Sequence, residues 1–157
     1  MNGKVETSLK QLSSLSKSLN EASDELSKQI SAIQSALNEF KFGIWAWVKE
    51  PILTESELSD PDETGQRFLF NYHHRLGYGK HKGKWGLLVS YAWEGTDEEE
   101  ITFLRDAPRH VRIKATDTIP NLLDVLIKEM STVTQEASKK ASEAKELAAA
   151  LNSKKSR

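Results

Sequence analysis

The sequence predicts an α+β fold, in which a small antiparallel sheet is flanked by two long terminal helices. Two observations support this class. Apolar residues recur with a period of about 3.5 near both ends of the chain, whereas the middle is rich in β-branched and aromatic residues. All four tryptophans and all three tyrosines lie in that middle. We expect residues 1–157 to form a single domain.

The N-terminal helix is expected over residues 5–41. Its apolar residues follow one another at alternating steps of four and three, interrupted by Ser16 and Ser23. A sustained period of this kind is typical of a coiled-coil seam. A helix cannot bury such a stripe against itself, so it requires a partner. The predicted seam consists of Leu9, Leu12, Leu19, Leu26, Ile30, Ile33 and Leu37.

The C-terminal helix is expected over residues 118–151, followed by a frayed tail over 152–157. Thr118 is a suitable N-cap and Pro120 suits the first turn. We expect the two helices to pair antiparallel as a coiled coil or helical bundle, with Leu26 facing Val133. The sequence leaves open whether they pair within one chain or between chains. The second seam consists of Leu123, Leu126, Met130, Val133, Ala137 and Ala144.

Between the helices, residues 42–104 are expected to form an antiparallel meander of about four strands joined by acidic loops. Asp106 can cap a short helix over 106–116, although the alternation of Val111, Ile113 and Ala115 also permits a strand there. The expected strands cover residues 42–48, 67–74, 84–93 and 100–104.

The segment RLGYGKHKGKW (75–85) is basic and lies between two acidic segments. The formal net charge is −1, so any attraction to nucleic acid must be local. Lysines beside aromatic rings can bind phosphates and stack on bases, but lysines and glycines are also ordinary residues of a hairpin tip. The candidate anion or nucleic-acid patch consists of Arg75, Tyr78, Lys80, His81, Lys82 and Lys84.

Motifs for catalysis or metal binding are not found. The absence of cysteine excludes disulfides and thiolate chemistry. The glycines of GYGKHKG have the wrong spacing for a dinucleotide-binding loop, and the segment joins two strands. Adjacent His73 and His74 point to opposite faces of a strand. We assign no catalytic residue, metal or cofactor. The sequence also allows a ligand pocket between the sheet and the helices, with Tyr72, His74 and Tyr91 as its polar members.

These patterns favour a non-enzymatic module for protein–protein interaction and oligomerisation, most simply a homodimer that also contacts an unidentified protein partner. A small nucleic-acid-binding protein that uses the 75–84 hairpin is the first alternative. A small-ligand-binding protein or enzyme is the second. The sequence shows neither a signal-peptide pattern nor an apolar run long enough to span a bilayer. We therefore expect a cytoplasmic location and no association with membranes.

Overall fold

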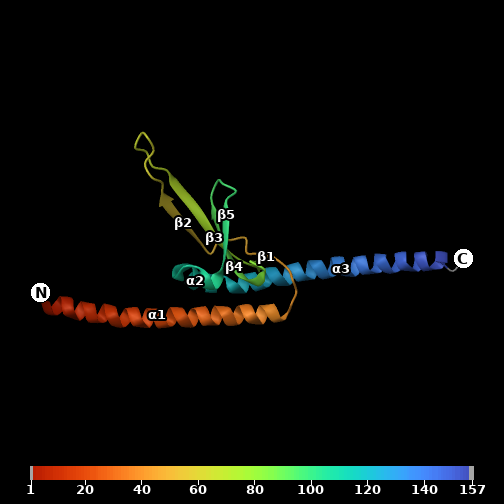
Figure 1. Cartoon of the computed structure of the whole chain (residues 1–157), viewed down its shortest axis with the longest axis horizontal. Helices are drawn as coiled ribbons and strands as arrows, with labels where there is room; N and C mark the ends of the chain where they lie inside the picture. The colour runs from red at the N-terminus through yellow and green to blue at the C-terminus, as the bar shows by residue number, and fades with distance from the viewer. Residues whose placement is uncertain (1, 156–157) are drawn as a thin grey trace.

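Two long helices form the base of the molecule, and the β-sheet rises from their central part (Figure 1). The computed structural model describes residues 2–155. Helix α1 (Asn2–Glu39) and helix α3 (Ile119–Lys155) coincide with the two segments of 3.5-residue period. The short helix α2 (Arg109–Thr116) follows a 3-10 turn, η1 (Leu104–Asp106), so the helical alternative for this segment is the one observed.

The sheet is antiparallel and has five strands, which confirms the predicted α+β class. Strands β3 (Leu69–His81), β4 (Lys84–Trp93) and β5 (Glu99–Phe103) form a meander. Strand β3 is longer than expected and continues through the glycine-containing segment. Lys82 and Gly83 form a tight turn with positive φ angles between β3 and β4.

One edge of the sheet is divided between two strands, of which the second was not predicted. Strand β1 (Ala46–Trp47) and strand β2 (Leu53–Leu58) both pair with β3. Pro51 lies between them and cannot donate a ladder hydrogen bond. The backbone N–H of Val48 donates to the carbonyl of Leu76, and that of Ile52 donates to the carbonyl of His74. Residues 49–51 therefore form a short bulge, and the chain stays paired with β3 on both sides of it. The acidic composition of β2 concealed it, because an exposed edge strand tolerates charged residues.

Tryptophan rings of the first strand region lie over glycines of β3. Trp47 pairs with Gly77, and a Cβ on Gly77 would lie 2.3 Å from the Trp47 ring. Likewise, a Cβ on Gly79 would lie 2.1 Å from the Trp45 ring. Both glycines lie within strand β3. Glycine is required at these two positions because a side chain would occupy the space of the indole rings.

The hydrophobic core lies where the base of the sheet meets the helices. Ile30 from α1, Leu87 from β4 and Leu122 from α3 belong to one buried cluster. The main tertiary contacts of α1 are with α2, η1 and β4, whereas those of α3 are with β1 and β3. The two long helices thus share a core through the sheet and α2.

The predicted antiparallel coiled coil is not confirmed within the chain. Figure 1 shows α1 and α3 running in the same direction and overlapping over only part of their lengths. The middle of the α1 seam is covered instead by α2, where Arg112 donates to Ser23 and Ser27. Ser23 therefore interrupts the seam because it accepts a hydrogen bond from α2.

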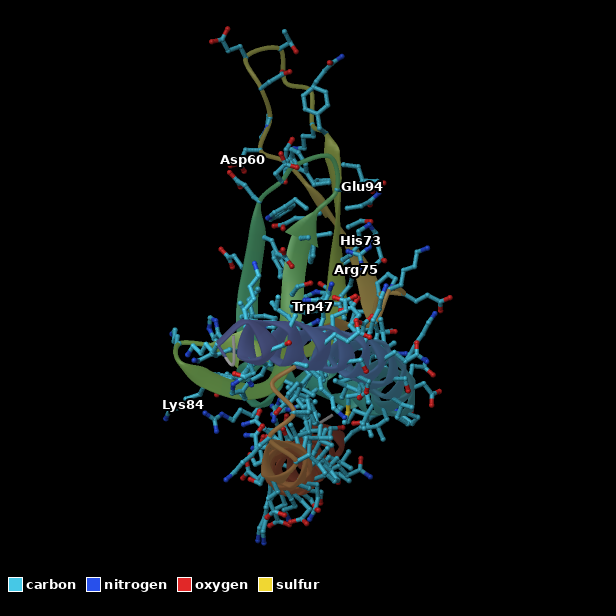
Figure 2. The ribbon with its side chains drawn as sticks, turned by 90° about the vertical axis from the view of Figure 1, so that its right-hand side faces the viewer. Trp47, Asp60, His73, Arg75, Lys84 and Glu94 are labelled. Carbon is cyan, nitrogen blue, oxygen red and sulfur yellow. The ribbon has the colours of Figure 1, made fainter. Side chains whose placement is uncertain are left out.

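The sheet has two ends of different character (Figure 2). Asp60 and Glu94 lie at the end remote from the helices, and Lys84 lies beside the helices. Asp62 orders the distal acidic loop because its carboxylate accepts from the backbone N–H groups of Thr64 and Gln66. No helix among residues 2–155 is both long and apolar enough to cross a membrane.

Candidate functional site

The predicted seam of α1 divides into a buried part and an exposed part. Ile30 and Leu37 belong to the core, and Leu26 and Ile33 pack partly against it. The preceding half of the helix, which we call the α1 arm (residues 2–22), extends beyond the rest of the molecule (Figure 1). All large apolar residues of this arm are exposed: Val5, Leu9, Leu12, Leu15 and Leu19.

Helix α3 is also divided into a buried part and an exposed part, but here the buried part comes first along the chain. Leu126 is buried in the core, whereas Leu123 is exposed. The following part, the α3 arm (residues 127–155), projects toward the other end of the molecule (Figure 1). Met130 is half-buried beside the 40–45 linker, and Ala137 and Ala144 are exposed. The exposed large apolar residues of the arm are Ile127, Val133, Leu147 and Leu151.

A second cluster of interest surrounds the carboxylate of Glu55 on β2. Tyr72, the cross-strand partner of Glu55, donates its hydroxyl hydrogen bond to Oε2 at 2.9 Å. His110 of α2 places Nε2 2.5 Å from Oε1. The Nε2 atom of buried His74 lies 3.4 Å from the same Oε1 but makes no hydrogen bond. One carboxylate therefore connects the edge strand, the neighbouring strand and α2.

The pKa values of this cluster follow from its contacts. The hydrogen bond with His110 lowers the pKa of Glu55, and the hydrogen bond from Tyr72 adds to this effect. The same carboxylate raises the pKa of Tyr72. Burial lowers the pKa of His74, because desolvation disfavours the imidazolium form. The arrangement therefore holds Glu55 ionised and His74 neutral near pH 7.

The predicted pocket residues Tyr72, His74 and Tyr91 do lie together. Their ring centroids are 4.7 to 5.7 Å apart. His74 and Tyr91 also line a cleft of about 400 Å³ that is bounded by β5 and the start of α2. Glu55 and His110 were not predicted as members. Glu55 occurs in a segment that was expected to be a loop, and only the packing of α2 brings His110 to this face.

The structure separates the members of the predicted basic patch. Arg75 donates from Nε to the carbonyl of Lys49, and Figure 2 shows it on the side of the sheet away from Lys84. Tyr78 is buried and donates its hydroxyl hydrogen bond to Oδ1 of Asn38 at 2.5 Å. The remaining residues, Lys80, His81, Lys82 and Lys84, stay together around the β3–β4 turn.

Within residues 2–155, no group of three or more His, Asp or Glu side chains has the arrangement of a metal site. The Glu55 cluster joins its residues through hydrogen bonds and ring contacts. Comparisons of the chain with models of known protein families, with curated proteins and with solved structures found no match.

Proposed function

We propose that this chain is an assembly module, which forms a homodimer through its two helical arms and presents the β-sheet to a further protein partner. The observation that carries this proposal is the exposure of large apolar side chains along both arms, joined on the α3 arm by the exposed alanines Ala137 and Ala144. Leu12 and Leu147 are each 62% exposed in the isolated chain. Burial of one such side chain contributes roughly 1.5–3 kcal/mol, so stripes of this length favour association.

The directions of the helices support a specific mode of pairing. Helices α1 and α3 run in the same direction, and their arms project toward opposite ends (Figure 1). A two-fold axis perpendicular to the helices reverses their direction in the second copy. Such an axis aligns the α1 arm of each protomer with the α3 arm of its partner, antiparallel. The predicted register of Leu26 with Val133, continued for two heptads, places Leu12 opposite Leu147 of the other protomer.

The distal end of the sheet is our candidate surface for the further partner. It carries exposed apolar side chains beside its acidic loops, including Leu58, Phe68 and Phe70. Apolar residues rimmed by charge are a common composition of protein interfaces. We also propose a cytoplasmic location. We do not propose nucleic-acid binding, because Arg75 lies away from the lysines and the distal loops are acidic.

Sedimentation equilibrium tests the homodimer. We expect the full chain to sediment as a dimer at tens of micromolar, which corresponds to about 6–7 kcal/mol of association free energy. Leu12→Asp and Leu147→Asp should each shift the equilibrium to monomer. Ser14→Asp and Ala149→Asp, which lie on the opposite helical faces, are the matched controls. Leu126 is unsuitable for this test because it belongs to the core. A monomeric parent chain would refute the homodimer.

Disulfide crosslinking tests the pairing of α1 with α3. The chain contains no cysteine, so introduced thiols have no competitors. The test variant carries both Leu12→Cys and Leu147→Cys. Because the two arms of one chain point apart, these thiols cannot meet within a chain, and oxidation should give covalent dimers. Either single variant alone should stay uncrosslinked. Efficient crosslinking of Leu12→Cys alone would instead show that two α1 arms pair with each other.

A further inference from the structure

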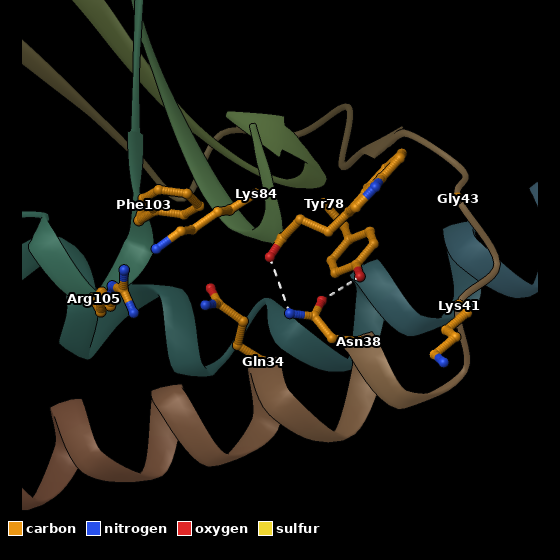
Figure 3. Close-up of a pocket in the computed structure, with 9 residues that line it drawn as sticks. Gln34, Asn38, Lys41, Gly43, Tyr78, Lys84, Phe103 and Arg105 are labelled. Atoms are coloured by element: carbon orange, nitrogen blue, oxygen red, sulfur yellow. Dashed lines mark hydrogen bonds between the residues drawn. The ribbon is translucent and has the colours of Figure 1, made fainter. Parts of the chain in front are cut away.

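A pocket of about 500 Å³ lies between the C-terminal turns of α1, the β3–β4 hairpin and the β5–η1 junction (Figure 3). It is separate from the arms and from the Glu55 cluster. Helix α1 contributes Gln34 and Asn38, the hairpin contributes Lys84, and the segment after β5 contributes Arg105. A volume of this size is within the range of small-molecule sites.

The charged residues that line this pocket are all cations. Lys84 and Arg105 point to one end of the pocket, beside Gln34, and Lys41 lies toward the other end (Figure 3). The ion pair of Arg105 Nε with Asp106 is long, at 3.9 Å, and both side chains are well exposed. Such a pair is weak and leaves the guanidinium able to bind another anion. The lining therefore creates a local positive potential in a chain with almost no net charge.

A buried amide adds a fixed hydrogen-bond donor to this end of the pocket. Gln34 is only 9% exposed, and its Oε1 accepts from the backbone N–H of Leu87 at 3.0 Å. This bond orients the amide, and the Nε2 donor has no hydrogen-bond partner among residues 2–155. Gly86 makes the position possible, since a Cβ there would lie 2.4 Å from Gln34 Oε1. Because Nε2 is not one of the fully buried unpaired polar atoms, it is accessible from the pocket, where a ligand or water can accept its hydrogen bonds.

The middle of the pocket is a wall whose polar groups are already paired. Asn38 donates from Nδ2 to the carbonyl of Trp85 at 3.0 Å and accepts from Tyr78, as Figure 3 shows. The Trp85 ring stacks on Tyr78 at an interplanar angle of 21°, and Arg105 lies over the Phe103 ring. Because these rings are engaged with protein neighbours, the groups left to recognise a ligand are the Lys41 and Lys84 ammonium groups, the weakly paired Arg105 guanidinium and the Gln34 amide.

We propose that this pocket binds the phosphate group of a small phosphorylated molecule, between Lys84, Arg105 and the Nε2 atom of Gln34. A phosphate offers several acceptor oxygens and about two negative charges at pH 7, which match two cations and a neutral donor. The rest of the ligand extends along Asn38 toward Lys41. Inorganic phosphate shares the recognised chemistry and is the other source of the group.

Titration of the full chain tests the site, with tryptophan fluorescence, to which Trp85 in the pocket wall contributes, as one measurement and calorimetry as the second. The probes are inorganic phosphate, glycerol 3-phosphate, AMP and uncharged adenosine. We expect saturable binding of the phosphorylated probes and none of adenosine. Tighter binding of an ester than of inorganic phosphate would identify the ester as the ligand class, and equal affinities would identify free phosphate. Both results support a phosphate site.

Lys84→Gln and Arg105→Gln should each weaken binding by about ten- to a hundredfold, the loss expected for one charge-assisted hydrogen bond. Lys82→Gln is the matched control, because Lys82 lies on the same hairpin but outside the pocket. Arg105→Lys should retain part of the affinity. The proposal is overturned if no phosphorylated probe binds, if Lys82→Gln has the same effect, or if affinity rises with oligonucleotide length, which would indicate a nucleic-acid surface.

Discussion

Arg112 of α2 donates a hydrogen bond from Nη2 to Oγ of Ser23 on α1, at 3.1 Å. The same guanidinium also donates to the Ser27 side chain and to the carbonyl of Ser23. This relationship explains a serine in an otherwise apolar stripe. It also fixes which element covers the middle of α1. The large apolar side chains of the α1 arm stay exposed.

Replacement of Arg112 by alanine should lower the free energy of unfolding by about 1–3 kcal/mol, the range for partly buried hydrogen bonds from a charged group. Denaturant unfolding monitored by tryptophan fluorescence measures the change. Arg109→Ala is the matched control, because Arg109 is exposed and makes one hydrogen bond, with Asn20. An equal loss in the two variants would mean that the contact with Ser23 has no special weight.

Gly77→Ala should destabilise the fold by about 1–3 kcal/mol, because the added methyl group overlaps the Trp47 ring and forces it to move. In the Trp47→Ala background the same substitution should cost much less, since the two residues are in contact. Gly3→Ala, where nothing lies within 4 Å of the added Cβ, is the control and should not destabilise. Thermal unfolding of the four variants measures the coupling. Additive effects of the two core substitutions would contradict the prediction.

Acidification should destabilise the chain through the Glu55 cluster. The lowered pKa of Glu55 means that its contribution is present above its ordinary value of 4.5 and is lost as the pH falls through the folded-state value. The lowered pKa of His74 acts in the same direction, because its contribution is present above 6.5 and is lost on protonation of the folded state. The free energy of unfolding should therefore decrease as the pH falls below 6.5, through His74, and again below 4.5, through Glu55.

Glu55→Gln tests this pH dependence because it keeps the shape of the side chain and removes its charge. We expect a smaller decrease in the free energy of unfolding across the acid range, measured in denaturant at successive pH values. Glu57→Gln is the control, since Glu57 is exposed two residues further along the same strand. If both variants keep the slope of the parent chain, Glu55 does not determine acid stability.

Helix content should depend on protein concentration if the arms pair between chains. Isolated helices gain little stability without packing, so dissociation should allow the arms to fray. Far-UV circular dichroism should show loss of ellipticity at 222 nm on dilution below the dimer dissociation constant. Leu12→Asp should show the lower ellipticity at all concentrations. Constant ellipticity during a dissociation seen by sedimentation would mean that the arms remain helical alone.

The periodicity of the sequence was sufficient to predict the elements whose side chains repeat regularly. The α1 and α3 helices follow from their seams, and β4 follows from its alternation of large residues. Strand β2 was missed because it is a mostly exposed edge strand with two glutamates, so it lacks the apolar residues by which the other strands were recognised. The extension of β3 was missed because Gly77 looks like a loop residue until Trp47 is placed above it.

The candidate sites, too, could be predicted only where a local sequence pattern connects their residues. Tyr72, His74 and Tyr91 were predicted together because every second residue of a strand lies on the same face of the sheet. Glu55 and His110 join them only through β2 and α2. The phosphate-pocket residue Lys84 was predicted as part of a basic tip, but Gln34 and Arg105 come from segments distant in sequence, and no local pattern connects them.

The amino-acid sequence by itself determined which faces of this chain are apolar, which segments are helical and where charge is concentrated, because these properties repeat with the local geometry of the backbone. Only the tertiary structure decided the partner of each face. Helix α2 occupies the middle of α1, the two long helices run in the same direction, and their outer halves remain uncovered. A hydrophobic stripe predicts that a helix face will be buried, but it does not specify which surface covers that face or in which direction the covering element runs.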